Sequence, residues 1–337
     1  MNKWKVIILS GTYGKAVPEA IERIREVAEV ERRKIPKGAT QEEIAEIISD
    51  ADIIVLGASG KIGKEVLLKT PNLKMIAKRG VGLDNVDLKA ATELGVLVTY
   101  TRHANSQSVA EHTIGLILTL VKNIVRAKEE LKEKGWRIRS ELVGIELAGK
   151  TLGVIGFGNI GRKVAKMAKN AFNMSVLVYD PYVSVDVVRS FGCRLVDLDT
   201  LLKESDIVTI HAALTEETYH MIGERELKLM KRTAYLINTA RGAIIDEKAL
   251  IKALKEGWIA GAALDVFEEE PLPKDHPLTK LKNVILTPHI AAFTKEALRR
   301  MDMMVAEDVA RACKGLKPHN IANPEVLSKI KWIRGNE

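Results

Sequence analysis

The sequence predicts an α/β fold with two domains, each built on a doubly wound parallel sheet. The chain has 337 residues, which exceeds one ordinary hydrophobic core and suffices for two domains. Short apolar runs alternate with segments of helical periodicity, a pattern typical of parallel strands wrapped by helices. A glycine-rich stretch near the middle of the chain opens a second series of the same kind. These observations together predict two successive α/β units.

The first hundred residues carry the first series. We expect strands at residues 6–9, 53–56, 73–77 and 96–98, and helices at residues 18–30, 41–48 and 88–94. Small-residue loops follow two of these strands, at residues 57–61 and 79–84. Ligands bind at the carboxyl ends of parallel strands, so both loops are candidate binding segments. Neither has the spacing of a P-loop.

The second series follows a long helix predicted from residue 106 to about residue 134, where apolar residues recur at helical spacing. Strands are expected at residues 151–155, 176–179, 194–196, 206–210, 234–238, 259–264 and 284–286, followed by a helix at 294–313 and an extended tail at 320–331. No Pro/Gly-rich linker separates the two series. We therefore expect the chain to cross twice between domains, on helices near residues 106 and 300. This gives a discontinuous domain of residues 1–104 and 300–337, and a second domain of residues 105–299.

Composition argues against several classes of protein. The net charge is +8, but lysine and arginine are interleaved with glutamate and few aromatic residues accompany them, so a solvated surface is favoured over a nucleic-acid interface. No apolar run is long enough to span a membrane, and the N-terminus reads as a first strand and not as a signal peptide. Cys193 and Cys313 lack metal-site spacing and are expected to be inert thiols in a reducing, cytoplasmic location. No metal site is predicted. The many lysines and glutamates, with only two glutamines, resemble a thermophile's composition.

The segment VIGFGNIG places Gly156, Gly158 and Gly161 between a predicted strand and a predicted helix. This spacing is typical of a dinucleotide-binding turn. The first glycine permits the tight turn, the second lets the backbone approach a pyrophosphate, and the third lets the helix pack on the strand. The helix N-terminus would then hold the pyrophosphate. Asp180 ends the next strand, where a carboxylate accepts ribose hydroxyls and repels a 2′-phosphate. We therefore predict NAD, not NADP, as the cofactor.

Three further clusters follow predicted strands, at residues 238–242, 265–271 and 288–292. Arg241 in the first is suited to bind a carboxylate and polarise a neighbouring carbonyl group. His289 in the third is suited to exchange a proton near neutral pH. A carboxylate bonded to His289 would fix its tautomer and favour the protonated ring. The residues themselves do not decide which of three consecutive glutamates, Glu268, Glu269 and Glu270, has this role.

These motifs resemble those of the NAD-dependent D-2-hydroxyacid dehydrogenase family. The resemblance rests on VIGFGNIG with Asp180, INTARGAIID, AALDVFEEEP and LTPHIAAFT, with RGVGLDNVD and NSQSVAEHT upstream, and it extends to the closing NPEVL. It implies two Rossmann-like domains, the discontinuous one catalytic, with the substrate in the cleft. It also implies a homodimer built around the cofactor domain, and hydride transfer between C2 of a 2-hydroxy acid and nicotinamide.

The resemblance also implies roles for individual residues. It makes Arg241, Glu270 and His289 catalytic, with His289 as the acid/base. In the substrate site it implies Arg241 and the backbone of Gly80, Val81 and Gly82, to which we add Lys61 and Lys78 as candidate phosphate-binding cations. In the cofactor site it implies Gly156, Gly158, Asn159, Ile160, Gly161, Asp180, Val109, Ala212, Thr239, Ala240, Arg241, Asp265, His289, Ala291 and Ala292. One departure stands out, because His211-Ala212-Ala213 replaces the usual His-x-Pro; we interpret His211 as structural.

The motifs look most like the D-3-phosphoglycerate dehydrogenase branch, which opens serine biosynthesis. Arg79 and Arg102 join Lys61 and Lys78 as possible partners of a substrate phosphate, but the loop at residues 57–61 lacks the arginine often found in that branch. A short phosphoglycerate dehydrogenase without a regulatory domain is the leading hypothesis. A glyoxylate/hydroxypyruvate reductase or a D-lactate-type enzyme is the alternative. A third hypothesis is an NAD-sensing interaction protein resembling C-terminal binding protein, although no disordered Pro/Ser-rich extension supports it.

Overall fold

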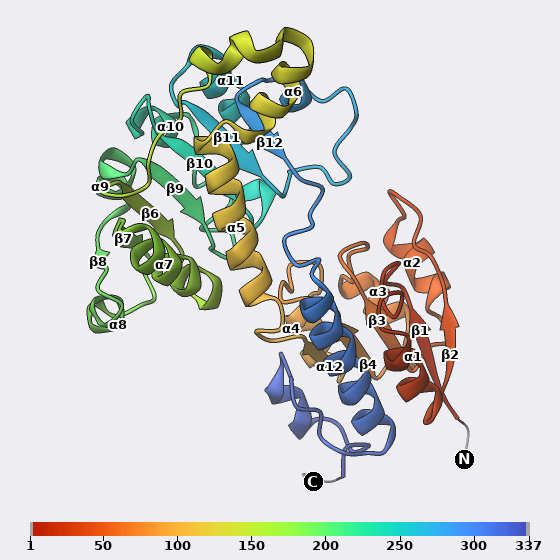
Figure 1. The fold of residues 1–337 in the computed structure, drawn as a ribbon. Helices are drawn as coiled ribbons and strands as arrows, with labels where there is room; N and C mark the ends of the chain where they lie inside the picture. Colours follow the sequence, from red (N-terminus) through yellow and green to blue (C-terminus); the bar gives the residue numbers. More distant parts are fainter. Residues whose placement is uncertain (1–2, 335–337) are drawn as a thin grey trace. The chain divides into compact units, whose positions relative to one another are not determined.

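The computed structural model describes residues 3–334, which form two compact units (Figure 1). Unit 1 joins the segment up to Asn105 with the segment from Phe293 onward, and unit 2 comprises Ser106–Ala292. Each unit contains one parallel sheet with helices on both faces, so the predicted fold class is confirmed.

Unit 1 is built on a five-stranded sheet with the order β2-β1-β3-β4-β5, all pairs being parallel. The strands are β1 (Trp4–Ile8), β2 (Ala28–Arg32), β3 (Ile53–Leu56), β4 (Met75–Lys78) and β5 (Leu97–Tyr100). The central strand β3 is buried on both faces, as expected for a parallel sheet between two helical layers. The order of the strands reverses between β1 and β3, and ligands bind at such switch points.

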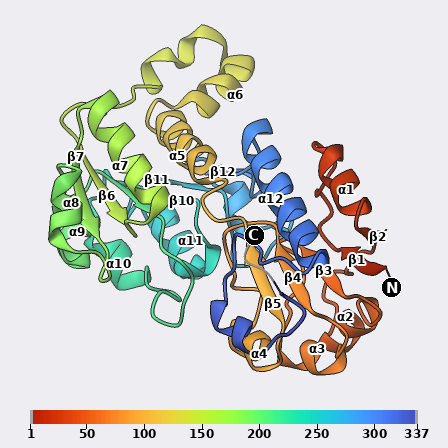
Figure 2. The ribbon, with the colours of Figure 1, turned by 90° about the horizontal axis from the view of Figure 1, so that it is seen from below.

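Helices cover both faces of this sheet (Figure 2). They are α1 (Pro18–Arg25), α2 (Gln41–Ile47), α3 (Lys64–Lys69), α4 (Leu88–Glu93) and α12 (Lys295–Cys313), followed by the 3-10 turn η4 (Pro324–Ser328). Alternate residues of β1 face opposite layers, because Val6 and Ile8 pack with α1 and α12 while Ile7 packs with α2, α3 and α4. All of α12 belongs to this unit. The chain therefore divides before Phe293 and not on the helix near residue 300.

The structure differs from the sequence analysis at three helices. The helix predicted at residues 18–30 ends at Arg25, and the chain then forms β2. The helix α3 was not expected at all. The helix predicted over residues 106–134 is two helices, because Asn123 adopts a left-handed backbone (φ 53°) that interrupts it. In addition, the tail predicted to be extended contains the 3-10 turn η4.

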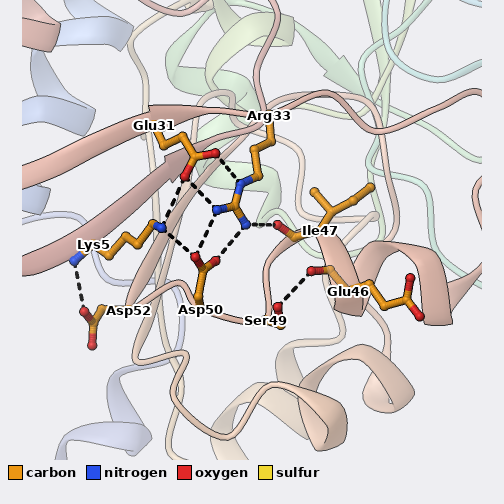
Figure 3. Close-up of polar contacts among 8 residues, drawn as sticks. All are labelled: Lys5, Glu31, Arg33, Glu46, Ile47, Ser49, Asp50 and Asp52. Atoms are coloured by element: carbon orange, nitrogen blue, oxygen red, sulfur yellow. Dashed lines mark hydrogen bonds and ion pairs between the residues drawn. The ribbon is translucent and has the colours of Figure 1, made fainter.

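A charged cluster explains why β2 was mistaken for helix (Figure 3). Arg33, just after β2, pairs with Glu31 at 2.6 Å and with Asp50 at 2.7 Å, and Lys5 of β1 pairs with the same two carboxylates. The hydrogen bonds from Arg33 lower the pKa of Glu31 to about 2. Charged residues are common on edge strands, where they discourage pairing with another chain. The charges of β2 therefore belong to a sheet edge, although their spacing also suits a helix.

Unit 2 is built on a seven-stranded parallel sheet with the order β12-β11-β10-β9-β6-β7-β8. Its strands are β6 (Thr151–Ile155), β7 (Ser175–Tyr179), β8 (Arg194–Leu195), β9 (Ile207–Ile210), β10 (Tyr235–Asn238), β11 (Gly261–Leu264) and β12 (Val284–Leu286). The order reverses between β6 and β9, and this switch point is where doubly wound sheets of this strand order bind dinucleotides.

Six principal helices and a helical arm surround this sheet. Its helical segments are α5 (Ser106–Val121), α6 (Ile124–Lys134), η1 (Gly135–Glu141), α7 (Asn159–Phe172), α8 (Val185–Ser190), α9 (Leu198–Glu204), α10 (Glu224–Leu229), η2 (Gly242–Ile244), α11 (Glu247–Glu256) and η3 (Pro277–Lys280). One core packs α5, α7 and α8 against the sheet, and the other packs α9, α10 and α11 against the opposite face. The carboxyl ends of the strands, between these layers, carry the predicted functional residues.

Candidate active site

The turn between β6 and α7 has the geometry of a dinucleotide-binding loop. Gly156 has φ +88°, and a Cβ there would lie 2.6 Å from the backbone nitrogen of Ala212. A Cβ on Gly161 would lie 2.1 Å from the carbonyl oxygen of Gly156, so a larger residue would push α7 away from the strand. A Cβ on Gly158 would meet no atom within 4 Å. The turn is thus closed where it packs on the sheet and open at the N-terminus of α7, where a pyrophosphate would fit.

Asp180 lies directly after β7 and is bonded to this turn. Its carboxylate accepts hydrogen bonds from the backbone N–H groups of Phe157 (2.7 Å) and Tyr182 (2.9 Å). These bonds fix the carboxylate beside the glycine turn. A carboxylate oxygen has more than one lone pair, so Asp180 retains acceptor capacity for ribose hydroxyls.

The Arg, Glu and His clusters follow β10, β11 and β12, which are neighbours in the sheet. The carboxyl ends of parallel neighbours meet at one edge, so the three loops lie side by side. The buried Asn238 shapes the first loop, because its side chain donates to the carbonyl oxygen of Arg241 at 2.8 Å and accepts from the N–H of Ala240 at 3.0 Å. Gly242 then approaches the next loop so closely that a Cβ would lie 1.9 Å from the carbonyl carbon of Phe267. Only glycine fits at this position, so the loops carrying Arg241 and Glu270 are in direct contact.

His289 and Glu270 form a short hydrogen-bonded pair. The distance between His289 Nδ1 and Glu270 Oε2 is 2.6 Å, and the other carboxylate oxygen of Glu270 accepts from the N–H of Phe267 at 3.1 Å. Both side chains remain more than a third exposed. Of the three consecutive glutamates, Glu270 is thus the one bonded to His289. This pairing leaves His289 Nε2 available to exchange a proton.

Asp265 holds the loop that carries His289. Its fully buried carboxylate accepts from the N–H groups of Ile290 (2.9 Å) and Ala291 (2.8 Å). The hydroxyl of Thr287 adds a third bond at 2.6 Å, and His112 Nε2 lies 3.6 Å away. Burial alone would raise the pKa of Asp265, but these donors outweigh it and hold the pKa below its ordinary value. Asp265 thus fixes the backbone on either side of His289, whose own φ is +53°.

Most of the remaining predicted cofactor residues of unit 2 follow strands of the sheet, and Val109 lies in α5. Thr239 is bonded through its hydroxyl to Thr113 at 3.0 Å, and Ala291 accepts from the hydroxyl of Ser108 at 2.6 Å. Val109 and Ala291 are buried. His211 is bonded to Thr209 at 3.0 Å, and burial lowers its pKa to about 3, so its ring is neutral. The neutral, enclosed ring is consistent with its interpretation as structural.

In unit 1, the predicted substrate residues fall into two groups. Gly80 donates to the hydroxyl of Thr101 at 3.0 Å, whereas among residues 3–334 the N–H groups of Val81 and Gly82 make no hydrogen bond. Lys78 is buried, and its ammonium donates to the carbonyl oxygen of Gly57 (2.5 Å) and to Asn85 (2.6 Å). Lys61 is exposed and lines a cavity of about 570 Å³ with Gln41, Gly63, Lys64, Glu65, Asp84, Val86 and Asp87.

Several positioning residues escaped the sequence analysis. Asn238, Thr287 and His112 contact the predicted residues but were not predicted themselves. Asn238 and Thr287 lie within motifs that were recognised, and each is a polar residue at a strand end. His112 lies on a largely apolar helix, where one histidine is more often structural than functional. The sequence does not show that His112 lies beside Asp265, because only folding brings the two residues together.

Two structural tests bear on other classes of function. Within the described part of the chain, no His, Cys, Asp or Glu side chains are grouped in threes so as to hold a metal ion. No single helix in residues 3–334 is long and apolar enough to cross a membrane. Within the same residues, one pair of helical segments has that length and composition when joined, Ser106–Val121 with Ile124–Glu141, and this pair is bent by 43°.

The fold and this site define the chain as a dinucleotide-binding α/β protein with an Arg, Glu and His cluster at its strand ends. A family model described as D-isomer specific 2-hydroxyacid dehydrogenase, NAD binding domain, matches residues 114–291. The chain belongs to this family. It is accordingly an NAD-dependent oxidoreductase acting on 2-hydroxy acids.

Individual relatives agree on the family and differ in substrate. The chain is 47% identical to the glyoxylate reductase of Thermofilum pendens, over 87% of this chain and 89% of that protein. It is also 47% identical to the D-3-phosphoglycerate dehydrogenase of Methanocaldococcus jannaschii over 93% of this chain, but it spans only 60% of that protein. The structure of D-lactate dehydrogenase from Aquifex aeolicus, complexed with NAD and lactic acid, has a TM-score of 0.82 and 34% identity, covering 98% of this chain and 99% of that one.

Proposed function

We propose that this enzyme uses NADH to reduce a small 2-keto acid without a phosphate group, such as glyoxylate. The observation that carries this choice is that Lys78 and Arg79, the two cations next to the Gly80–Gly82 loop, are buried and bonded to other groups of unit 1. Lys78 is 5% exposed and donates to Gly57 and Asn85. The side chain of Arg79 is 6% exposed and pairs with the buried Asp302. Both charges are engaged inside unit 1, so they are poorly placed to neutralise a substrate phosphate.

In the proposed mechanism, unit 2 supplies the acid and the electrostatic stabilisation. A nicotinamide cofactor bound at the glycine turn would supply the hydride for C2 of the keto acid. His289 donates its Nε2 proton to the oxygen as the carbonyl becomes an alcohol, while Glu270 holds Nδ1 and stabilises the protonated ring. Arg241 stabilises the negative charge that develops on that oxygen. In the reverse direction, His289 takes the proton back from the hydroxyl group.

Unit 1 is proposed to contribute backbone donors. The unbonded N–H groups of Val81 and Gly82 are adjacent in sequence and follow β4, where a parallel sheet presents ligand-binding loops. Two neighbouring N–H groups suit a carboxylate, which accepts hydrogen bonds on both oxygens. The N–H of Gly80 is bonded to Thr101, so we assign the carboxylate to Val81 and Gly82.

A phosphoglycerate dehydrogenase is the second candidate, favoured by the Methanocaldococcus jannaschii relative. Lys61 and Arg102 are exposed and remain available as phosphate ligands. The two candidate activities require different groups in unit 1. A phosphorylated substrate requires cations that bind its phosphate, whereas glyoxylate requires only the site for its carboxylate.

A substrate panel tests the proposal. We expect NADH oxidation with glyoxylate or hydroxypyruvate to exceed that with 3-phosphohydroxypyruvate by at least about tenfold in kcat/KM, which corresponds to about 1.4 kcal/mol of transition-state binding. Pyruvate and NADPH are run in parallel. A tenfold preference for the phosphorylated substrate would make the enzyme a phosphoglycerate dehydrogenase. Absence of turnover on the whole panel would favour an NAD-sensing interaction protein instead.

We also propose that the chain forms a homodimer through the arm formed by α6 and η1. An exposed patch of apolar side chains indicates an interaction surface. On and near this arm the exposed apolar side chains are Ile124, Val125, Leu131, Trp136 and Val143. Trp136 is 76% exposed, and an exposed tryptophan is typical of an interface centre. We expect Trp136→Glu to convert a dimer into a monomer in light scattering coupled to gel filtration. The exposed Tyr182→Glu in the same unit serves as the control. A wild-type monomer, or a variant that stays dimeric, would contradict the proposal.

A further inference from the structure

We infer that four side chains, His220, Glu268, Glu247 and His276, position the loop that holds Glu270 against His289. We call them the support cluster. The inference rests on the proposed function, because it assigns these residues a task only if Glu270 and His289 act in catalysis. None of the four is among the predicted catalytic, cofactor or substrate residues, so they are positioning residues and not catalytic ones.

The two glutamates of the cluster bind each other's backbone. Glu268 accepts from the N–H of Glu247 at 3.0 Å, and Glu247 accepts from the N–H of Glu268 at 3.4 Å. Glu247 is the first residue of α11, so the carboxylate of Glu268 lies where the helix N-terminus favours negative charge. This reciprocal pair joins the loop after β11 to the start of a helix that is packed into the core.

Each glutamate is also bonded to a histidine. His220 Nε2 lies 2.8 Å from Glu268 Oε1, and His276 Nε2 lies 3.1 Å from Glu247 Oε1. His276 accepts from the N–H of Leu278 on its other ring nitrogen, which leaves the proton on Nε2, facing Glu247. Burial raises the pKa of Glu247, so His276 bonds a carboxyl group in a partly buried place.

The support cluster is connected to the loop of Arg241 as well. The N–H of His220 donates to the carbonyl oxygen of Ala243 at 2.9 Å, and Ile222 forms a parallel bridge with Ile245. Gly242 packs on the backbone of Phe267 and Glu268. Four segments therefore meet at the cluster: residues 220–222, residues 242–247, residues 267–268 and residues 276–278.

Only one residue, Glu269, separates Glu268 of this anchor from Glu270 of the catalytic pair. Phe267 and Glu268 both donate their N–H groups to carboxylates, Phe267 to Glu270 and Glu268 to Glu247. Glu270 in turn is bonded to His289 at 2.6 Å. A shift of Glu268 therefore moves the backbone that orients Glu270. A proton-transfer geometry tolerates little displacement, and misplacement by about 1 Å can cost a hundredfold in rate.

Substitutions at Glu268 test the inference. Glu268→Ala removes the acceptor for both His220 and Glu247, whereas Glu268→Gln keeps an oxygen that can accept. We expect Glu268→Ala to lower kcat for keto-acid reduction at least about tenfold, with the KM for NADH within about twofold of wild type. The alkaline limb of its pH–rate profile should move to lower pH, because a displaced Glu270 stabilises the protonated His289 less. Glu268→Gln should keep most of the activity and the wild-type profile.

Controls separate positioning from folding and from the proposed function. Glu256→Ala on the exposed end of α11 should leave kcat and the pH profile unchanged. If Glu268→Ala does not fold, as judged by circular dichroism, His220→Asn replaces it, since asparagine tolerates the φ of +51° but is too short to reach Glu268. A variant with lower thermal stability but wild-type kcat and pH profile would overturn the inference. Lack of wild-type turnover with any keto acid would overturn the proposed function instead.

Discussion

The two units build the same kind of sheet and equip its carboxyl edge in opposite ways. Unit 2 places ionisable side chains there and leaves them reachable, as with His289 and Glu270. Unit 1 buries two of its cations there, Lys78 and Arg79, and uses them to hold loops together. In the loop after β4, the backbone N–H groups of Val81 and Gly82 make no hydrogen bond within residues 3–334. The carboxyl edge of a doubly wound sheet can thus offer a ligand either ionisable side chains or unbonded backbone N–H groups, depending on which polar groups the loops use in their own hydrogen bonds. We call the N–H groups of Val81 and Gly82 the backbone cradle.

The same contrast extends to buried carboxylates. Asp265 in unit 2 accepts from Ile290, Ala291 and Thr287, and its pKa is lowered. Asp308 in unit 1 accepts from His319 and Asn320, but burial dominates and its pKa is raised. The number and strength of donors decides whether a buried carboxylate is stabilised as an anion.

Removing the acid of unit 2 should give the largest effect. We expect His289→Ala to lower kcat for keto-acid reduction by about 10²–10⁴-fold, because general-acid catalysis contributes on that order. NADH binding, followed by fluorescence titration, should change little, since the glycine turn and Asp180 are intact. His319→Asn, at an exposed histidine of unit 1, is the matched control and should keep full activity. A His289→Ala enzyme within tenfold of wild type would place the acid elsewhere.

The sequence predicts those parts of the site whose residue spacing is itself a geometric requirement, and it does not predict those that depend on contacts formed by folding. The glycine turn was predictable because the spacing of Gly156, Gly158 and Gly161 is itself the geometric requirement. The burial of Lys78 was not, because it depends on Asn85 and on the carbonyl oxygen of Gly57, which only the folded sheet brings together. The choice of Glu270 among three glutamates came from family resemblance, and the 2.6 Å contact now supplies its physical basis.

Elements with ambiguous patterns were the ones missed. The strand β2 has only two apolar residues, Ala28 and Val30, among Glu29, Glu31 and Arg32, and its place at the edge of the sheet became apparent only from its pairing with β1. The break at Asn123 is a single backbone conformation, and the apolar pattern runs through it without interruption. Local propensity and periodicity do not determine the pairing of a strand or the backbone conformation of a single residue, because both depend on tertiary contacts.

Stability as a function of pH should separate the two buried aspartates. The lowered pKa of Asp265 stabilises the fold above the ordinary aspartate pKa of about 4, and this contribution is lost as pH falls through the folded-state pKa. We therefore expect Asp265→Asn to lower the free energy of unfolding by about 1–3 kcal/mol at pH 7, with a smaller deficit in acid. Urea unfolding between pH 3 and pH 7 is the measurement.

Asp308→Asn should show the opposite dependence. The raised pKa of Asp308 stabilises the fold below its ordinary value, and this contribution is lost as pH rises through the folded-state pKa. Its asparagine variant should thus compare more favourably with wild type at pH 7 than in acid. If both variants responded to pH with the same sign, the donor count would not be what distinguishes the two sites.

A change in the loop of unit 1 should have a smaller effect, confined to the substrate. Gly80 has φ +143°, a conformation that L residues rarely adopt, although a Cβ there would meet only Lys78 Cε at 3.8 Å. Gly80→Ala should therefore cost about 1–3 kcal/mol in backbone strain and not through a clash. Relief of that strain would move the N–H groups of Val81 and Gly82, so we expect the KM for the keto acid to rise about tenfold, with the KM for NADH unchanged.

Gly95→Ala provides the matched control in the same unit. Gly95 also has a positive φ of +76°, and a Cβ there would meet only Ile330 Cγ2 at 3.7 Å, but it lies just before β5 and not at its carboxyl end. It should lower thermal stability about as much as Gly80→Ala while leaving both KM values at wild type. If the two variants raised the keto-acid KM equally, the effect would reflect general loosening of unit 1. A rise confined to Gly80→Ala would instead assign the substrate carboxylate to the backbone cradle, because only that variant strains the loop carrying the two unpaired donors.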